Sequence, residues 1–316
     1  MLSRFLNSTH SFPIWKNNWV PKTYSFFKDK TIANKIMEHG YAIIKADKIN
    51  YALIESLYTD NHTLSNEKGG MFYSIYSKNL SYRQKIHEKL GEYLDIQYNH
   101  LFSNYKSVLN SFVVKKKGEG SEFKIHQDST GLNEWEHSPI NVWIPLTDVD
   151  ENNGCLHLIP TSHYWASPYR GISIPPNYEN VIRELMPYFK PIILKKGEIL
   201  LFDNRVLHTS SANYSDSTRI VAMSGIFPKE AQLYCCHQED ENSKVEIYLQ
   251  SEDFLLKNKN FYDNCHVRPY LGKCVKKVKQ SSNMINKNQL DEFKLKLKKY
   301  SNTITDLHTN FISEPI

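Results

Sequence analysis

The sequence predicts a mainly β protein, built as a sandwich, jelly roll or barrel, with α-helices packed around it. Three observations support this fold class. From about residue 105 to residue 228 the chain is a series of short apolar runs bounded by turn signals, which is typical of such folds. The residues before this segment space their apolar side chains as helices do. Aromatic residues make up 13% of the 316, with 20 Tyr and 15 Phe, which suits β-rich packing.

The N-terminal part, about residues 30–103, predicts helices that flank the β core. A helical run over residues 32–37 ends at Gly40, and residues 41–44 follow as a strand. Two further segments, residues 51–58 and 82–102, are amphipathic helix candidates. The second has one apolar face, which consists of Ile86, Leu90, Tyr93, Leu94 and Tyr98. We expect this face to pack on a sheet.

The β core is predicted over about residues 105–228, and one long insertion interrupts it. Seven runs qualify as strands: residues 108–114, 123–127, 140–145, 155–159, 191–194, 198–202 and 219–227. Asn and Gly in residues 151–154 tolerate positive φ and predict a hairpin turn, and residues 195–198 predict another. Residues 166–190 contain four prolines and no strand pattern. Long loops in compact domains are often lids, so we expect a lid-like insertion here.

A single domain over residues 1–275, followed by a basic C-terminal tail over residues 276–316, is the predicted organisation. Residues 244–249 are one more candidate strand. In the tail, Leu290, Phe293, Leu297 and Tyr300 form one apolar helical stripe. The formal net charge is +5, and residues 273–299 hold nine Lys against two acids, so the basic character lies in this segment. It predicts a solvated amphipathic helix, with a docking tail as the alternative.

The cysteines and the apolar runs bear on the compartment. Five Cys is an odd number, and no pair has zinc-ligand or CxxC spacing, so a reducing cytoplasm is the predicted location. Residues 1–19 have no long apolar region, and no signal peptide is evident. No run approaches the roughly 20 apolar residues that a membrane span needs.

A candidate metal site combines His126-Gln-Asp128 with a distant histidine. Side chains two apart on a strand share a face, so His126 and Asp128 can converge on one ion. Chance alone gives about 0.7 such triplets in a chain of this composition, and His237-Gln-Glu239 is a similar triplet without a distal partner. His208 follows the apolar strand at residues 198–202. Two His and one carboxylate form the facial triad of non-haem Fe(II) oxygenases.

Such a triad leaves iron positions for 2-oxoglutarate and O₂. The distal carboxylate of 2-oxoglutarate then needs a cation, and Arg binds a carboxylate through a planar fork that keeps its charge. Arg219 begins the apolar run after His208 and is the candidate for this contact.

The motifs around these residues resemble the phytanoyl-CoA dioxygenase (PhyH) family. The resemblance covers roughly residues 30–230 and is densest in His126-Gln-Asp128, in residues 141–163 (NVWIPLTDVDENNGCLHLIPTSH) and in residues 197–208 (GEILLFDNRVLH). It implies a double-stranded β-helix, which is a jelly roll related to the cupins, with Fe(II), 2-oxoglutarate and O₂ as cofactor and cosubstrates.

The resemblance also implies a role for individual residues. His126, Asp128 and His208 match the iron ligands, and Arg219 matches the residue that binds the cosubstrate carboxylate. Ser210 matches a hydroxyl on the same carboxylate, with a turn hydroxyl as the alternative, and Trp143 matches an aromatic residue of that pocket, with core packing as the alternative. For an upstream polar residue on the strand at 105–114, Asn110 and Ser111 are both candidates. The family's upstream Lys has no position that matches.

The predicted activity is oxidation of a small molecule, with release of succinate and CO₂. Halogenases related to the family replace the carboxylate ligand by a small residue, so Asp128 favours hydroxylation. One alternative is a non-catalytic cupin-like binding protein. Another is a nucleic-acid demethylase, but those enzymes resemble a pattern with a second Arg where this chain has Gly225, so no nucleic-acid partner is expected. The substrate and the oligomeric state stay open. Arg170, in the insertion, is expected to be solvated or to meet an anionic substrate.

Overall fold

Two facing antiparallel sheets form the centre of the molecule. The computed structural model describes residues 22–62, 70–257, 272–279 and 284–304. Residues 1–19, where no signal peptide was expected, lie outside these ranges. The larger sheet has the strand order β1-β8-β5-β10-β3-β2, and the smaller has the order β4-β9-β6-β7. From β3 to β10 the chain passes back and forth between the two sheets, except that β6 and β7 lie together in the smaller sheet, and this is the arrangement of a double-stranded β-helix. The predicted fold class is confirmed.

The strands of both sheets coincide largely with the predicted runs. The larger sheet consists of β1 (Tyr41–Lys45), β8 (Glu198–Asp203), β5 (Ile140–Pro145), β10 (Arg219–Pro228), β3 (Tyr105–Lys115) and β2 (Met71–Tyr73). The smaller sheet consists of β4 (Phe123–His126), β9 (His208–Ser210), β6 (Leu156–Leu158) and β7 (Lys190–Ile192). The sequence did not predict β2 and β9, because three residues are too few to give a periodic signal.

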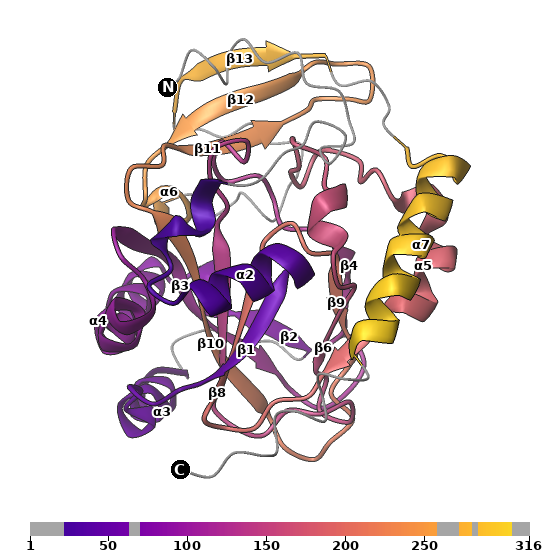
Figure 1. The fold of residues 1–316 in the computed structure, drawn as a ribbon. Coiled ribbons are helices and arrows are strands. Elements are labelled where there is room, and N and C mark those ends of the chain that lie inside the picture. The colour runs from indigo at the N-terminus through magenta and orange to yellow at the C-terminus, as the bar shows by residue number, and fades with distance from the viewer. Residues whose placement is uncertain (1–21, 63–69, 258–271, 280–283, 305–316) are drawn as a thin grey trace.

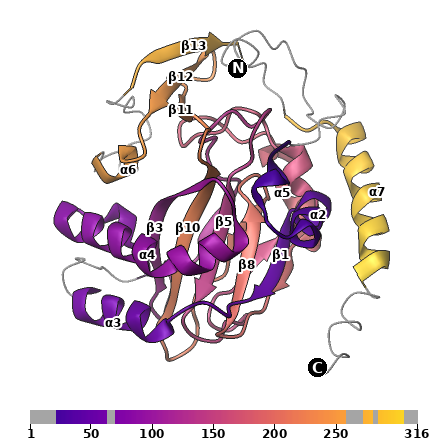
Figure 2. The same cartoon turned by 60° about the vertical axis from the view of Figure 1, so that its left-hand side comes forward.

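Helices cover the outer face of the larger sheet, as Figure 2 shows for α3 and α4. The three long N-terminal helices are α2 (Lys30–His39), α3 (Tyr51–Asn61) and α4 (Leu80–Leu101). Each begins after an Asp or Asn whose side chain accepts a hydrogen bond from a backbone N–H of the first turn. The predicted apolar face of α4 is buried against the sheet, in a cluster that includes Phe112 and Val114 of β3.

The two faces of β3 have different surroundings. Phe112 and Val114 point toward the helices, whereas Val113 belongs to a second cluster between the sheets, together with Trp143 and Val221. Because side chains alternate along a strand, Ser111 and Lys115 share the interior face with Val113. This interior is where the candidate functional residues meet.

A small third sheet lies above the β-helix in Figure 1. It has the order β11-β12-β13, with β11 (Leu233–His237), β12 (Val245–Gln250) and β13 (Cys274–Val278). Only β12 was predicted, and β13 crosses the predicted boundary between residues 275 and 276. The division into one domain and a tail stays a prediction.

The insertion and the C-terminal helix pack together. Short helices occupy the insertion: α5 (Ile182–Leu185) and the 3-10 helices Glu179–Val181 and Met186–Tyr188. Helix α7 (Lys287–Ile304) runs beside α5 (Figures 1 and 2). Its Phe293 contacts Trp165 with the ring centroids 3.8 Å apart. Leu290, Phe293 and Leu297 are buried in one cluster with Tyr178 and Leu185.

The expectation of a solvated tail helix is therefore corrected: Leu290, Phe293 and Leu297 of α7 are buried against the insertion, and the opposite face of the helix is exposed. The side chain of Tyr300, the fourth member of the predicted stripe, lies outside the described part. No described helix is long and apolar enough to cross a membrane.

Candidate metal centre

The structure brings His126, Asp128 and His208 together. His126 is the last residue of β4, and the antiparallel register places it opposite His208, the first residue of β9. The two imidazole centroids are 4.0 Å apart. One ligand atom from each of the three side chains lies within 4.8 Å of the others. Residues far apart in the sequence thus form one cluster at the end of a strand pair.

Both histidines point the same ring nitrogen toward the centre of this cluster. Nδ1 of His126 is 2.8 Å from the carbonyl oxygen of Lys124, and Nδ1 of His208 is 2.9 Å from that of Val206. A carbonyl only accepts, so Nδ1 carries the hydrogen and Nε2 keeps its lone pair. Metal-ligating histidines are usually oriented in this way by a backbone carbonyl. The donor set therefore fits a divalent transition metal such as Fe(II).

Asp128 is held by a neighbouring amide. The Asn141 side chain donates from Nδ2 to Oδ2 of Asp128 over 2.6 Å, and Oδ1 lies 3.5 Å from Nε2 of His126. Burial raises the pKa of Asp128, but His126, His208 and the Asn141 amide outweigh it and lower the pKa to about 2. Burial, together with the charge of His126, lowers the pKa of His208 to about 4. At neutral pH the carboxylate is ionised and His208 is neutral, which are the forms that bind a cation.

Aromatic side chains surround the cluster, and one side of it is open. The Phe123 ring is 4.2 Å from His126, and the Phe202 ring is 5.1 Å from His208. Tyr73 follows, with its ring 5.9 Å from Phe123. The side chains of His126 and Asp128 are 24% and 35% exposed. A ligand can therefore reach the cluster from solvent at the His126 and Asp128 side.

Arg219 lies in the interior beside Trp143. The guanidinium carbon is 5.1 Å from the centroid of the Trp143 ring, and Nη1 donates to the carbonyl oxygen of Gly154 over 2.5 Å. Nε is buried and has no hydrogen-bond partner among the described residues. Arg219 and Trp143, both candidates for the cosubstrate site, thus lie side by side.

A second buried cation, Lys115, is the register partner of Arg219 on β3. Its ammonium donates to the carbonyl oxygen of Ser211. Burial, and then the charge of Arg219, lower the pKa of Lys115 to about 7. Among the described residues, no carboxylate lies within ion-pair distance of either cation. Two adjacent buried cations without an acidic partner fit a carboxylate supplied by a ligand.

The remaining predicted pocket residues divide between the two faces. Ser210 is buried two residues after His208 on β9, so it shares the face of that ligand. Asn110 is not brought to the site: its side chain donates to the carbonyl oxygen of His87 on α4, outside the larger sheet. Ser111, the other candidate, has a buried hydroxyl without a partner among the described residues. Strand alternation thus favours Ser111 over Asn110 for the interior position.

Sequence reasoning missed Lys115, Asn141 and the surroundings of Arg170. Lys115 could have been found from strand parity, because it stands an even number of positions from Ser111. Arg170 is neither solvated nor placed on a substrate: it is buried and makes two 2.7 Å hydrogen bonds to the Glu134 carboxylate. No sequence signal pairs these two residues, since neither stands in a periodic element.

Comparison with known proteins places these observations in context. The family model of phytanoyl-CoA dioxygenase (PhyH) matches residues 16–221. A phytanoyl-CoA dioxygenase domain-containing protein 1 homolog of Dictyostelium discoideum is 30% identical over 216 residues, which cover 63% of this chain and 73% of that protein. The phytanoyl-CoA dioxygenase domain-containing protein 1 of Danio rerio is 34% identical over 131 residues, 39% of this chain and 45% of that protein. The match thus spans less than half of the Danio rerio relative.

Solved structures of similar fold have low sequence identity to the chain. The non-heme alpha ketoglutarate dependent carbocyclase SnoK from nogalamycin biosynthesis has a TM-score of 0.45 at 18% identity, covering 68% of this chain and 89% of its own. EctD from S. alaskensis with 2-oxoglutarate and 5-hydroxyectoine has a TM-score of 0.45 at 16% identity, covering 70% and 82%.

Proposed function

Because the chain belongs to the phytanoyl-CoA dioxygenase (PhyH) family, we propose that it is an Fe(II)- and 2-oxoglutarate-dependent oxygenase that hydroxylates a small molecule. The observation that carries this proposal is the cluster of His126, Asp128 and His208, with both Nε2 atoms free to bind a metal. Two histidines and one carboxylate leave coordination positions for a cosubstrate and O₂. The substrate gains one oxygen atom of O₂, and 2-oxoglutarate becomes succinate and CO₂ with the other.

In this proposal the protein binds and orients the reactants, and the bound iron supplies the oxidative chemistry. His126 and His208 hold the metal through Nε2, and Asn141 fixes Oδ2 of Asp128 so that Oδ1 faces the ion. Arg219 and Lys115 hold the distal carboxylate of 2-oxoglutarate, and the Ser210 hydroxyl adds a donor there. Trp143 forms a wall of that pocket and excludes water from the Arg219 guanidinium. Ser111 takes the place predicted for Asn110.

The test is the visible absorption band that Fe(II) and 2-oxoglutarate form together without O₂. We expect the band in the wild-type protein and its loss in His126→Ala and in His208→Ala. His157→Ala is the matched control, because His157 lies in the same small sheet but pairs with Glu151. Absence of the band in the folded wild-type protein would rule the proposal out.

Succinate release separates an oxygenase from a cupin-like binding protein. Under air, the iron-loaded protein should convert 2-oxoglutarate to succinate slowly, and a metabolite screen should reveal compounds that accelerate the conversion. Binding of 2-oxoglutarate without any succinate would favour the binding protein instead.

A further inference from the structure

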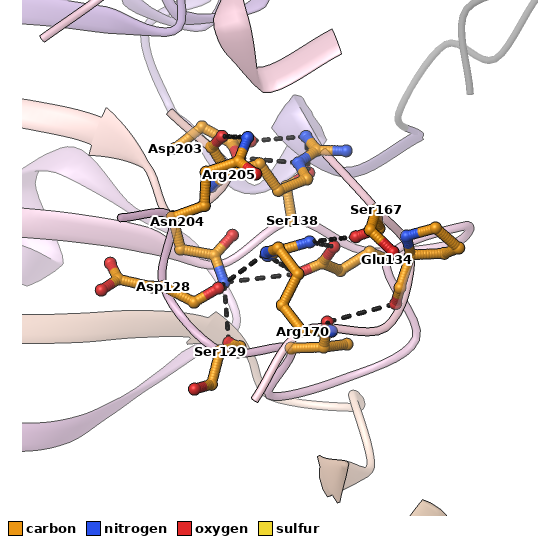
Figure 3. A network of polar contacts seen from close by, with 12 residues as sticks. Asp128, Ser129, Glu134, Ser138, Ser167, Arg170, Asp203, Asn204 and Arg205 are labelled. Atoms are coloured by element: carbon orange, nitrogen blue, oxygen red, sulfur yellow. Dashed lines mark hydrogen bonds and ion pairs between the residues drawn. The ribbon is translucent and has the colours of Figure 1, made fainter. Parts of the chain in front are cut away.

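The Arg170 side chain connects the insertion to Asp128 (Figure 3). Its Nε donates to the main-chain oxygen of Asp128 over 2.7 Å. Nη1 and Nη2 each donate to one oxygen of Glu134, also over 2.7 Å, and Nη1 donates in addition to the carbonyl oxygen of Ser167. Arg170 and Glu134 are both buried. One guanidinium thus reaches three segments of the chain at once.

The main chain after β4 depends on such contacts. The strand ends at His126, so no sheet ladder continues through Asp128. The amide of Asp128 donates to the carbonyl oxygen of Asn204 over 3.0 Å, and the Arg170 bond holds its carbonyl oxygen from the other side. Two residues later, Thr130 and Arg170 exchange hydrogen bonds through the amide of each. The segment that presents Asp128 is therefore clamped between residues 167–170 and Asn204.

The side chain of Asn204 connects the clamped segment to Glu134. Its Nδ2 lies 3.3 Å from Oε1 of Glu134, the carboxylate that also holds Arg170, and 3.5 Å from the carbonyl oxygen of Ser129. Both sides of the clamp thus meet at Glu134. A displacement of Arg170 would act directly on the main chain of Asp128, because the Nε hydrogen bond joins the two residues.

Stability alone is a poor explanation of this arrangement. A buried ion pair contributes little net stability compared with well-packed apolar residues, because both charges lose their hydration. A guanidinium fork, however, fixes geometry as well as charge, since its donors lie in one plane. An ammonium in the same place could pair with Glu134 but could not present the same fork to Glu134 and Asp128 together.

From these contacts we infer that Arg170, anchored by Glu134, is a positioning residue that sets the main chain of Asp128 for metal binding. The inference rests on the proposed function, because it requires Asp128 to be a metal ligand. Through this bond the insertion acts on the metal centre although it contributes no ligand.

The experiment measures binding of Co(II), a spectroscopic probe for the iron position, by the full chain. Arg170→Lys keeps the charge beside Glu134 and loses the fork. Arg183→Lys is the matched control, the same change at an exposed Arg of the same insertion. Arg205→Lys is a second control, because Arg205 pairs with Asp203 in the neighbouring buried pair and its side chain makes no bond to Asp128. The double variant Arg170→Met/Glu134→Met removes both charges and serves if Arg170→Lys does not fold.

Loss of an outer partner of a metal ligand typically weakens metal binding about 10- to 100-fold. We expect a loss of this size, with an altered Co(II) absorption spectrum, in Arg170→Lys and in the double variant. Both control variants should keep the wild-type affinity and spectrum. Wild-type affinity and spectrum in the folded Arg170 variants would overturn the inference, as would an equal loss in Arg205→Lys. Failure of the wild-type protein to bind one Co(II) would instead overturn the proposed function.

Discussion

At the scale of single residues, Lys115 is a buried amine whose pKa of about 7 leaves it partly protonated at neutral pH. Arg219 lies beside it on β10, and Cys155 and Glu122 are the further titratable groups that act on it. The thiol of Cys155 is uncharged at neutral pH, because burial raises its pKa to about 11. Lys115 therefore loses its proton at a pH near 7 in the protein without a ligand.

This balance predicts that 2-oxoglutarate binding depends on pH. Below pH 7 Lys115 is already protonated, and the dissociation constant should be flat. Above pH 7 binding must take up a proton, so the dissociation constant should rise by up to about tenfold per pH unit. Titration of the Co(II)-loaded protein with 2-oxoglutarate between pH 6 and pH 9 measures this slope. The Lys115→Met variant should bind 2-oxoglutarate more weakly at pH 6, and its dissociation constant should not rise above pH 7.

Lys117→Met is the control, because Lys117 stands two residues further on, is exposed and pairs with Asp216. It should keep the wild-type slope and affinity. An unchanged slope in Lys115→Met would show that Lys115 does not hold the cosubstrate.

The metal triad was predictable from sequence, while its support was not. His126, Asp128 and His208 stand in motifs that resemble those of the family, and this resemblance, rather than spacing alone, identified them. The contact between Asn141 of β5 and Asp128, like that between Arg170 and Glu134, joins segments that only the folded chain brings together. Asn110 was a candidate because composition does not reveal strand parity, and the positive φ of Leu109 disturbs the alternation just before it.

At the scale of elements, the junction of α2 and β1 is a tightly packed turn. Gly40 ends α2 at φ +85°, and its amide donates to the carbonyl oxygen of Ile36 over 2.8 Å. A Cβ at this position would lie 2.6 Å from Cγ2 of Val206 and 2.7 Å from Nδ1 of His163. Both neighbours are buried, so neither can give way easily.

Gly40→Ala should accordingly lower the free energy of unfolding by more than a comparable change elsewhere. A left-handed backbone costs a non-glycine residue about 1–2 kcal/mol, and overpacking adds about 1–3 kcal/mol. Gly197→Ala is the matched control, since Gly197 has φ +102° and no atom within 4 Å of the added Cβ. Urea unfolding of the two variants separates the cost of the left-handed backbone, which both share, from the cost of overpacking, which only Gly40→Ala has. Equal losses of the free energy of unfolding in the two variants would mean that Val206 and His163 move to make room for the added Cβ.

Most elements were predictable, because apolar periodicity and turn residues mark them. The strands of the core from β3 to β8 and β10 fall on the predicted runs. The short strand β9 was missed although it carries His208, because a three-residue strand of mostly polar side chains forms only through its neighbours β4 and β6. Strand β13 was missed for a related reason: its lysines suit an exposed edge and disguise the strand.

At the scale of the whole molecule, the insertion is fastened on several sides. Arg170 holds its start, the amide of Gln238 donates to the hydroxyl of Ser173 from the third sheet, and α7 covers its helical end. The amide of Ile285, just before α7, donates to the carbonyl oxygen of Asn177 over 2.9 Å. A segment with these contacts forms a wall of the molecule rather than a free flap.

Two leucines of α7 test how strongly the helix fastens the insertion. Leu297 is 3% exposed in the cluster with Tyr178, whereas Leu295 is 71% exposed. Truncation of a buried Leu to Ala costs about 2–5 kcal/mol, but local undocking of α7 sets an upper limit to the loss. Leu297→Ala should therefore raise hydrogen exchange across residues 177–189, while Leu295→Ala should leave it unchanged. Equal exchange in both variants would show that α7 does not hold the insertion.

The sequence indicated an amphipathic helix here but not its partner. An apolar stripe is a property of one segment, whereas its burial depends on apolar side chains of another segment. The sequence around Trp165 and Leu185 has no periodic pattern that predicts such an apolar surface. The concentration of lysines favoured a solvated helix, and the exposed side of α7 does carry them.

Docking by α7 has a consequence for how the chain matures. The three candidate metal ligands, with Arg170 and Arg219, all precede β11 in the chain and are therefore synthesised first. The apolar surface around Trp165, Tyr178 and Leu185 stays uncovered until α7 has been synthesised. Until then the nascent chain exposes this apolar surface beside the candidate metal centre. Exposed apolar surfaces are what chaperones and quality-control proteases recognise. Docking of α7 is thus a late step, which covers this surface only after the residues of the candidate metal centre have been synthesised.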